Sequence, residues 1–434
     1  MLTIDGVSAK ELVSHYGSPL HVLNEKKLAE NYHGFLGAFE AEYPNVSLAT
    51  SYKTNPVPHV LKCLHDLGSH AEVISHFELW LALKLGVPPE RLILNGPGKG
   101  NAALELAVEK RVKLINVDGP GEIEKIAVAA RRLGVRQKVG LRVITSVGWS
   151  SQFGLSLASG AAEAAYARMT EFPELEPAAI HLHLGTRIQS VQTYVQAVEE
   201  VIQFSEMLAS KYGIQIDHFD LGGGFGVPTV RGIADWDVRM LSLGYPARFA
   251  NPDSVPKPAD YAKALAPLLN KLRHKTSDSV DCPAIVFEPG RAITSSSQVL
   301  LLSVMGKKQG VGGNDFLILD GGANLALPLE WETHQIFPAT QMNATASRKC
   351  DVFGPLCHPG DVLCQNRQLP ALEEGDVLAV MDSGAYFIPN QMNFSNPRPA
   401  VATVRNGQHQ LVRRREEFTD IVRMDQSPGF DHGA

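Results

Sequence analysis

Short apolar runs alternate with helical patterns along most of the chain. The runs span 46–52, 70–75, 91–96, 113–118, 138–144, 178–184, 218–223 and 284–289. Most of them are continuous rather than alternating with polar residues, which is typical of parallel strands buried on both faces. Eight β/α units over roughly 250 residues predict an α/β fold of the TIM (β/α)8 barrel type, with a doubly wound open sheet as the alternative. The segment 228–257 is rich in turn-forming residues and predicts a surface loop.

The pattern changes after about residue 290. Short strand-like runs now alternate with Gly, Asp and Asn turns, and Asn406-Gly407 predicts a tight hairpin. We therefore expect a barrel domain over 26–290. A mostly β C-terminal domain should follow over 291–434, joined by residues 1–25.

Composition narrows the class of protein. The 434 residues are 44% hydrophobic and 20% charged, with a net charge of −6, which is a globular balance and argues against nucleic-acid binding through a basic face. The sequence contains no apolar run long enough for a membrane span and no signal-peptide pattern, so we expect a cytoplasmic protein without a membrane partner. Its five cysteines form no CxxC pair, so neither a disulfide framework nor a metal site is expected.

Reactive residue types stand directly after several of the predicted strands, where the strands of a barrel converge on one mouth. Lys53 is either a Schiff-base amine or a surface lysine, and the triple glycine from residue 222 is either a phosphate cradle or a tight turn. Glu288 follows an apolar run and needs a cationic partner, either a protonated ring nitrogen or Arg291. His183 either stacks on a flat ring or is an ordinary core histidine.

Ten motifs occur in an order that resembles the fold-type III PLP-dependent decarboxylases, the group containing diaminopimelate and ornithine decarboxylases. They are SYKTN, HAEVISHFEL, LILNGPGK, INVDG, LRV…SQFG, HLHLGT, DLGGGFG, FEPGR, FGPLC…D and DSGAY. The match covers nearly the whole chain, with Glu72 where an aspartate is common. The resemblance implies an enzyme, a PLP-dependent amino-acid decarboxylase of amino-acid biosynthesis, with pyridoxal 5'-phosphate (PLP) bound in the barrel.

The resemblance also implies roles for matching residues. Lys53 would form the Schiff base with PLP, His183 would stack on its ring, and Glu288 would pair with the pyridinium nitrogen. Cys357 of the partner subunit would handle the proton after carbon dioxide leaves, in a homodimer with shared active sites. The phosphate would be held by residues that follow several strands, namely Thr186, Gly222, Gly223, Gly224, Arg291 and Tyr386.

The substrate is where the chain departs from the family pattern. His358 follows Cys357, where diaminopimelate enzymes have a glutamate and ornithine enzymes an aspartate, and histidine anchors an ammonium group poorly. Together with Asp361 and Trp331 it is a candidate substrate contact. We therefore expect an amino acid with a neutral, anionic or conjugated distal end, carrier-linked substrates included.

Three alternatives remain to that interpretation. The first is a diaminopimelate or basic-amino-acid decarboxylase proper. The second is an amino-acid racemase of the same fold, against which Glu288 argues because an arginine typically faces the ring nitrogen there. The third is a non-catalytic PLP-binding regulator, which the retained lysine, phosphate ligands and cysteine disfavour.

Overall fold

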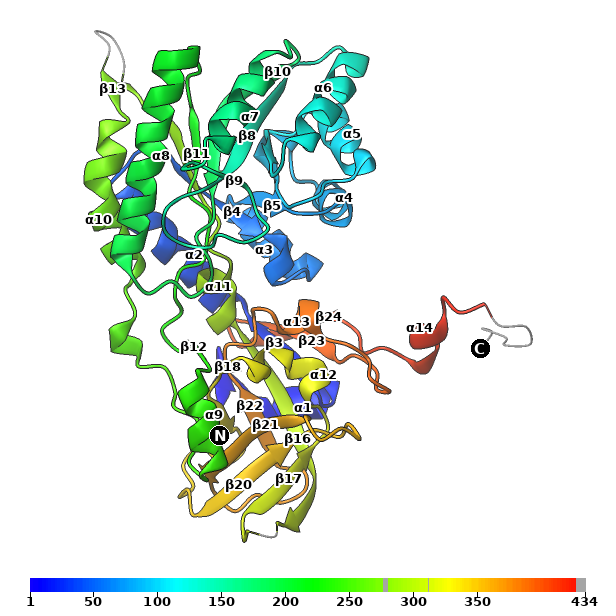
Figure 1. The fold of residues 1–434 in the computed structure, drawn as a ribbon. Helices are drawn as coiled ribbons and strands as arrows, with labels where there is room; N and C mark the ends of the chain where they lie inside the picture. The colour runs from blue at the N-terminus through cyan, green and yellow to red at the C-terminus, as the bar shows by residue number, and fades with distance from the viewer. Residues whose placement is uncertain (276–279, 311, 427–434) are drawn as a thin grey trace. The chain divides into compact units, whose positions relative to one another are not determined.

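The computed structural model describes residues 1–275, 280–310 and 312–426 (Figure 1). The chain forms two compact units. The barrel unit comprises Glu30–Gly226 and Asp253–Ile293, and the β unit comprises Met1–Ala29, Val227–Pro252 and Thr294–Ala434. The β unit therefore includes a segment from the middle of the chain that the expected division at residue 290 left in the barrel. The last residues of the expected β domain, 427–434, lie outside the described part of the chain.

The barrel unit contains a closed parallel sheet. Eight of its strands form the ring: β4 (Val46–Ser51), β5 (His70–Val73), β6 (Leu92–Leu94), β7 (Leu114–Val117), β8 (Gln137–Ile144), β10 (Leu175–Leu182), β11 (His218–Asp220) and β15 (Ala284–Phe287). Neighbouring strands pair in parallel, and the pairing of β8 with β10 closes the ring. Each strand overlaps the apolar run that predicted it, so the TIM-barrel prediction is confirmed and the open-sheet alternative is wrong.

Helices connect the strands and pack around them (Figure 1). They include α3 (Pro58–Asp66), α4 (His76–Lys84), α5 (Asn101–Lys110), α6 (Gly121–Leu133), α7 (Ala161–Thr170), α8 (Val191–Tyr212) and α10 (Pro258–Lys271). Local signals set their ends. The Ser75 hydroxyl accepts the Glu78 N–H at the start of α4, and Gly134 ends α6 in the left-handed region at φ 62°.

The barrel interior is layered. Its floor is an apolar cluster, and two positions further along each of those strands comes a polar residue that points to the same side of the sheet. The floor residues are Ala49, Ile93, Leu114, Ala179 and Val286. The polar residues above them are Ser51, Asn95, Asn116, His181 and Glu288. The strand period alone therefore builds a polar layer at the carboxyl ends of the strands.

The β unit is organised around the long strand β16 (Gln298–Gln309). On one side follow β17 (Asp315–Leu319), β20 (Arg348–Phe353) and β21 (Val362–Leu369); on the other follow β3 (Leu20–Asn24), β23 (Ala400–Arg405) and β24 (Gln408–Arg413). A further strand, β22 (Val377–Val380), pairs with β16 and with β19 (Ile336–Pro338). The prediction of a mostly β second part is confirmed, and β3 brings the beginning of the chain into the same sheet.

The predicted hairpin joins β23 and β24. Asn406 and Gly407 adopt φ values of 52° and 74°, the two left-handed positions that a two-residue turn of this kind requires. The prediction made from the Asn-Gly pair is confirmed.

The segment expected to be an elaborate surface loop also contains regular structure. It forms strand β12 (Arg231–Gly232), paired with β18 (Glu332–Thr333), and helix α9 (Asp235–Ser242). The Asp237 carboxylate explains the helix, because it accepts the Ala234 N–H at 2.9 Å and the Arg231 guanidinium at 2.7 Å. The bond from Arg231 lowers the pKa of Asp237 to about 2.

Within the described ranges, no helix combines the length and apolarity that crossing a bilayer needs.

Candidate active site

Lys53 lies just beyond strand β4, in the short helix η1 (Tyr52–Thr54). Its Nζ is 2.7 Å from Ser51 Oγ and 2.8 Å from Glu72 Oε2. The lysine side chain is 33% exposed and the glutamate 1% exposed, so the amine reaches the barrel mouth while its counter-charge is buried. A lysine that merely snorkels to solvent would not approach a buried carboxylate, so this contact favours a functional amine.

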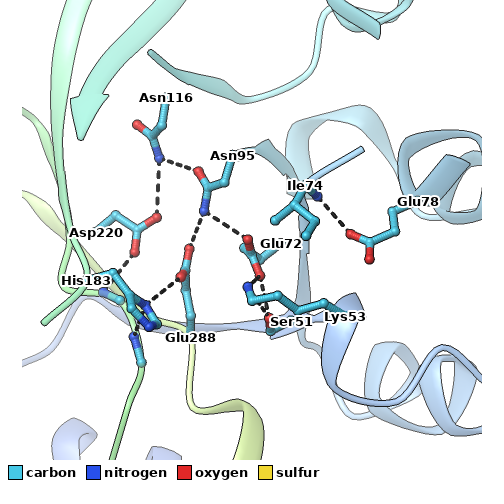
Figure 2. A network of polar contacts seen from close by, with 12 residues as sticks. Ser51, Lys53, Glu72, Ile74, Glu78, Asn95, Asn116, His183, Asp220 and Glu288 are labelled. Carbon is cyan, nitrogen blue, oxygen red and sulfur yellow. Dashed lines mark hydrogen bonds and ion pairs between the residues drawn. The ribbon is translucent and has the colours of Figure 1, made fainter. Parts of the chain in front are cut away.

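A buried amide joins this lysine pair to the second glutamate of the site. Asn95 donates from Nδ2 to Glu72 Oε1 at 3.2 Å and to Glu288 Oε1 at 2.6 Å, as Figure 2 shows. Asn116 in turn donates to Asn95 Oδ1 at 2.8 Å. All four side chains are at most 3% exposed, so these hydrogen bonds replace contacts with solvent, whereas the buried Asn116 Oδ1 has no hydrogen-bond partner among the described residues.

Glu288 is ionised despite its burial. Burial alone would raise its pKa, but His181, the hydrogen bond of His183 and the Lys53 charge hold that pKa well below its usual range. Both imidazoles lie 3.8 Å from Glu288 Oε2. Burial and the nearby charge of Glu288 raise the pKa of Asp220 well above normal. The pair therefore carries one negative charge, on Glu288, as expected for two acids in one buried site.

The triple glycine follows β11, and its backbone packs too tightly against neighbouring strand ends for side chains. A Cβ on Gly223 would lie 2.1 Å from the Glu288 carbonyl oxygen, and one on Gly222 would lie 2.2 Å from the Leu182 carbonyl oxygen. Gly222 and Gly224 also adopt positive φ, 64° and 91°. The glycines are thus required by the strand junctions themselves, and the turn they form leaves backbone at the mouth.

The other barrel residues expected at the site lie beside this turn. His183 and Thr186 are half-buried just after β10, and Arg291 is 9% exposed in α11 (Gly290–Thr294). His183 faces Trp149, with ring centroids 6.2 Å apart. Trp149 was not singled out from the sequence, although a tryptophan in a Gly/Ser-rich connection at the mouth was a usable signal.

The remaining predicted residues belong to the β unit. Cys357 and His358 are exposed on the turn between β20 and β21, Trp331 is 40% exposed, and Tyr386 is half-buried before α13 (Phe387–Asn390). Asp361 differs from the others because it is 2% exposed.

Asp361 fastens the loop that carries Cys357. Its two carboxylate oxygens accept backbone N–H groups of Ala323 and Leu356, each at 2.7 Å. Asp361 leaves no room for a side chain at Gly322, because a Cβ there would lie 2.0 Å from the aspartate Oδ1. With both oxygens engaged, this geometry favours a loop-positioning role for Asp361 over the substrate contact expected from the sequence.

The polar layer holds residues that the sequence analysis did not single out. Asn95, Asn116 and Asp220 are buried in the barrel and reach the predicted glutamate, or each other, through hydrogen bonds. The available signal was their place within apolar runs, because a polar residue inside a buried strand needs a partner.

Comparisons with known proteins agree over nearly the whole chain. Residues 32–295 match the family model described as pyridoxal-dependent decarboxylase, pyridoxal binding domain. A diaminopimelate decarboxylase of Aquifex aeolicus is 32% identical, over 97% of this chain and 94% of that protein. One from Methanothermobacter thermautotrophicus is 30% identical, over 98% and 96%. The crystal structure of the M. jannaschii diaminopimelate decarboxylase with L-lysine superposes with a TM-score of 0.86 at 27% identity, covering 98% and 96% of the two chains.

Proposed function

Since the chain belongs to the pyridoxal-dependent decarboxylase family and is therefore a carboxy-lyase that uses pyridoxal 5'-phosphate, we propose that its substrate is diaminopimelate. The observation that carries this proposal is the match, over nearly its full length, to diaminopimelate decarboxylases. Family, cofactor and reaction type agree with the sequence-based predictions. For the substrate, the comparisons favour the alternative prediction, a diaminopimelate or basic-amino-acid decarboxylase. They offer no support for a conjugated amino acid.

The donor set of the barrel fits the cofactor. The bound cofactor supplies an electron sink for the charge left when carbon dioxide departs. Lys53 would provide the amine that holds it, and the ionised Glu288 is the group that keeps a pyridine nitrogen protonated. His183 would support the ring face. Arg291 offers a cation suited to a phosphate, and the glycine turn carries no side chains that would keep a phosphate from the backbone.

The β unit would complete the site in a homodimer. Cys357 is exposed on its loop, which suits a thiol that delivers a proton to a substrate bound by another subunit. Tyr386 would add a phosphate contact and Trp331 a substrate contact. These roles follow from the motif matches.

A second candidate substrate is favoured by the residues around Cys357. A distal ammonium group needs a counter-charge when it leaves water, because a buried unpaired charge costs several kcal/mol. His358 supplies none, and its Nδ1 accepts the Gly360 N–H at 3.0 Å. The nearby Asp361 is engaged with backbone. An amino acid with a neutral, anionic or conjugated distal end would meet this loop without that cost.

Carbon dioxide release separates the two candidates. The PLP-loaded enzyme is assayed with meso-diaminopimelate, L-lysine, L-ornithine, L-glutamate and a glutamyl thioester at equal concentrations. We expect the highest kcat/KM for meso-diaminopimelate. A tenfold or greater preference for glutamate or its thioester would transfer the proposal to the second candidate.

The variant His358→Glu sharpens the same assay. If His358 lies at the substrate's distal end, a carboxylate there should raise kcat/KM for L-lysine and L-ornithine by about tenfold relative to wild type. The matched control is Glu330→Gln, which removes an acid at the end of the short helix η5 (Leu327–Glu330) that could bind the amine instead. A loss of diamino-acid turnover in Glu330→Gln, with no gain in His358→Glu, would place the amine contact at Glu330.

A further inference from the structure

Two buried carboxylates with different partners share one amide in the barrel. Glu72 pairs with the Lys53 amine, and Glu288 lies on the other side of Asn95 with the two histidines (Figure 2). Asn95 donates to both glutamates at 3.2 and 2.6 Å. The residue enters from strand β6, one position beyond its last residue, so the strand itself sets its place.

The hydrogen bonds determine how this amide is oriented. Between two carboxylates only the NH2 group can donate twice, and the carbonyl oxygen must then face a donor. Asn116 supplies that donor at 2.8 Å, and Asn116 also approaches Asp220 Oδ2 at 3.4 Å. The chain of contacts therefore has a single consistent direction, from Asn116 through Asn95 to the two glutamates.

The amide also separates charges that would otherwise interact directly. Two anions brought together in a buried site repel, and one of them takes up a proton unless a donor or cation lies between them. The charged and titratable groups around the glutamates are Lys53, Glu78, Asp118, Arg142, His181, His183 and Asp220. Arg142 is the second cation of this set, and its first counter-charge is Asp118 rather than either glutamate.

We propose that Asn95 is a positioning residue of the decarboxylase, which holds Glu72 on the Lys53 amine and Glu288 opposite the cofactor ring nitrogen. This inference rests on the proposed roles of Lys53 and Glu288, and it adds a residue that touches neither substrate nor cofactor. Its consequence is that the two ends of the cofactor site are electrostatically linked through one side chain. A change at Asn95 should then alter the protonation behaviour of bound PLP, and not only the stability of the barrel.

The experiment uses PLP as the probe and needs no substrate. Wild type, Asn95→Leu and Asn95→Ser are loaded with PLP, and the pH midpoint of the visible absorbance change is measured together with the PLP Kd. Leucine keeps the size and loses both donors, whereas serine keeps one donor. We expect Asn95→Leu to move the midpoint by about one pH unit or more and to raise the PLP Kd about tenfold. A change of this size in either quantity corresponds to the loss of one charge-assisted hydrogen bond. Asn95→Ser should move both in the same direction by less.

Gln137→Leu is the matched control. Gln137 is 3% exposed in strand β8 of the same barrel, and its amide likewise donates twice, to the carbonyl oxygens of Val112 and Lys138. We expect this variant to lower Tm without moving the midpoint or the Kd. An equal shift in Gln137→Leu would show general loosening of the barrel and overturn the proposal.

An unchanged midpoint and Kd in both Asn95 variants would also overturn it, because Glu72 and Glu288 would then be positioned without the amide. Neither readout involves an amino acid, so failure of the diaminopimelate assay leaves this test intact. Conversely, an altered PLP titration in the Asn95 variants does not depend on which substrate the enzyme decarboxylates.

Discussion

At the scale of single residues, neighbouring groups shift the pKa values of two buried acids in opposite directions. Glu288 and Asp220 are both acids inside the barrel, yet the pKa of Glu288 is held well below its usual range and that of Asp220 is raised far above it. The difference lies in their neighbours. Imidazoles and the Lys53 charge surround the glutamate, while the aspartate faces the negative charge of that same glutamate. Position among neighbours, rather than residue type, decides which acid carries the charge.

The reactive lysine gives the first prediction. Borohydride reduction of the PLP-loaded enzyme should fix the cofactor to Lys53, and Lys53→Arg should abolish both the label and activity. Lys99 is the internal control. It is another lysine of the barrel, it is buried so that its pKa is lowered, and it pairs with Glu122 at 2.8 Å. Peptide mapping of the reduced protein locates the label. Label on Lys99 would contradict the assignment.

A second acid near the lysine predicts a pH dependence of stability. Burial, with a contribution from Glu72, raises the pKa of Glu78 from 4.5 to about 7. Between these values the unfolded chain loses the proton while the folded chain keeps it. Proton binding by Glu78 therefore stabilises the folded state relative to the unfolded state. This contribution to the free energy of unfolding is fully present below pH 4.5 and is lost as pH rises through 7. Glu78→Gln does not titrate and can still accept the Ile74 N–H, which Glu78 accepts at 2.8 Å.

The free energy of unfolding of Glu78→Gln should accordingly rise relative to wild type by about 3 kcal/mol between pH 4.5 and 8. Urea unfolding at several pH values measures the difference. Glu109→Gln, at an exposed position of α5, serves as the control, and an equal rise there would argue against Glu78 as the source.

At the scale of elements, the strand junctions limit which side chains the barrel accepts. The turn after β11 packs its backbone against the carbonyl oxygens that end β10 and follow β15. Helix α2 (Glu25–Glu40) differs, because a Cβ on Gly37 would meet no atom within 4 Å. The same substitution should thus have opposite effects at the two places.

Gly223→Ala should lower the free energy of unfolding by about 2 kcal/mol or more and weaken PLP binding, since the methyl group would displace the turn. Gly37→Ala should be neutral or stabilise by up to about 1 kcal/mol, because alanine favours a helix. Thermal unfolding and PLP titration measure both. A stable, PLP-binding Gly223→Ala protein would mean that the junction can relax.

At the scale of the whole molecule, the proposed chemistry divides between the units. Lys53 belongs to the barrel unit and Cys357 to the β unit. If each site takes its cysteine from the partner subunit, a Lys53→Ala chain and a Cys357→Ala chain should complement each other. One of the two sites in the mixed dimer then has both groups.

An equal mixture of the two inactive proteins should recover up to about a quarter of wild-type activity after subunit exchange, because half of the dimers are mixed and each has one intact site. Activity is measured alongside subunit exchange, followed with differently tagged chains. No recovery despite verified exchange would place Cys357 in the site of its own chain.

The sequence by itself determined the architecture and the main chemistry. Continuous apolar runs predicted the eight strands that close the barrel, because strands buried on both faces tolerate few polar residues. The candidate residues at the ends of those runs, such as Lys53 and Glu288, were predicted because strand ends converge in a barrel. Even the hairpin at Asn406 followed from local backbone preference. All of these are properties that a residue shares with its near neighbours in sequence.

Only the tertiary structure decided which distant groups meet. Asn95 lies between Glu72 and Glu288 because three separate strands bring them together, and no local pattern encodes that contact. The same holds for Asp361, whose carboxylate accepts the N–H of Ala323 from 38 residues away in the chain. Hydrogen-bond partners and pKa values depend on atoms that are close in space, so they follow only once the chain has folded.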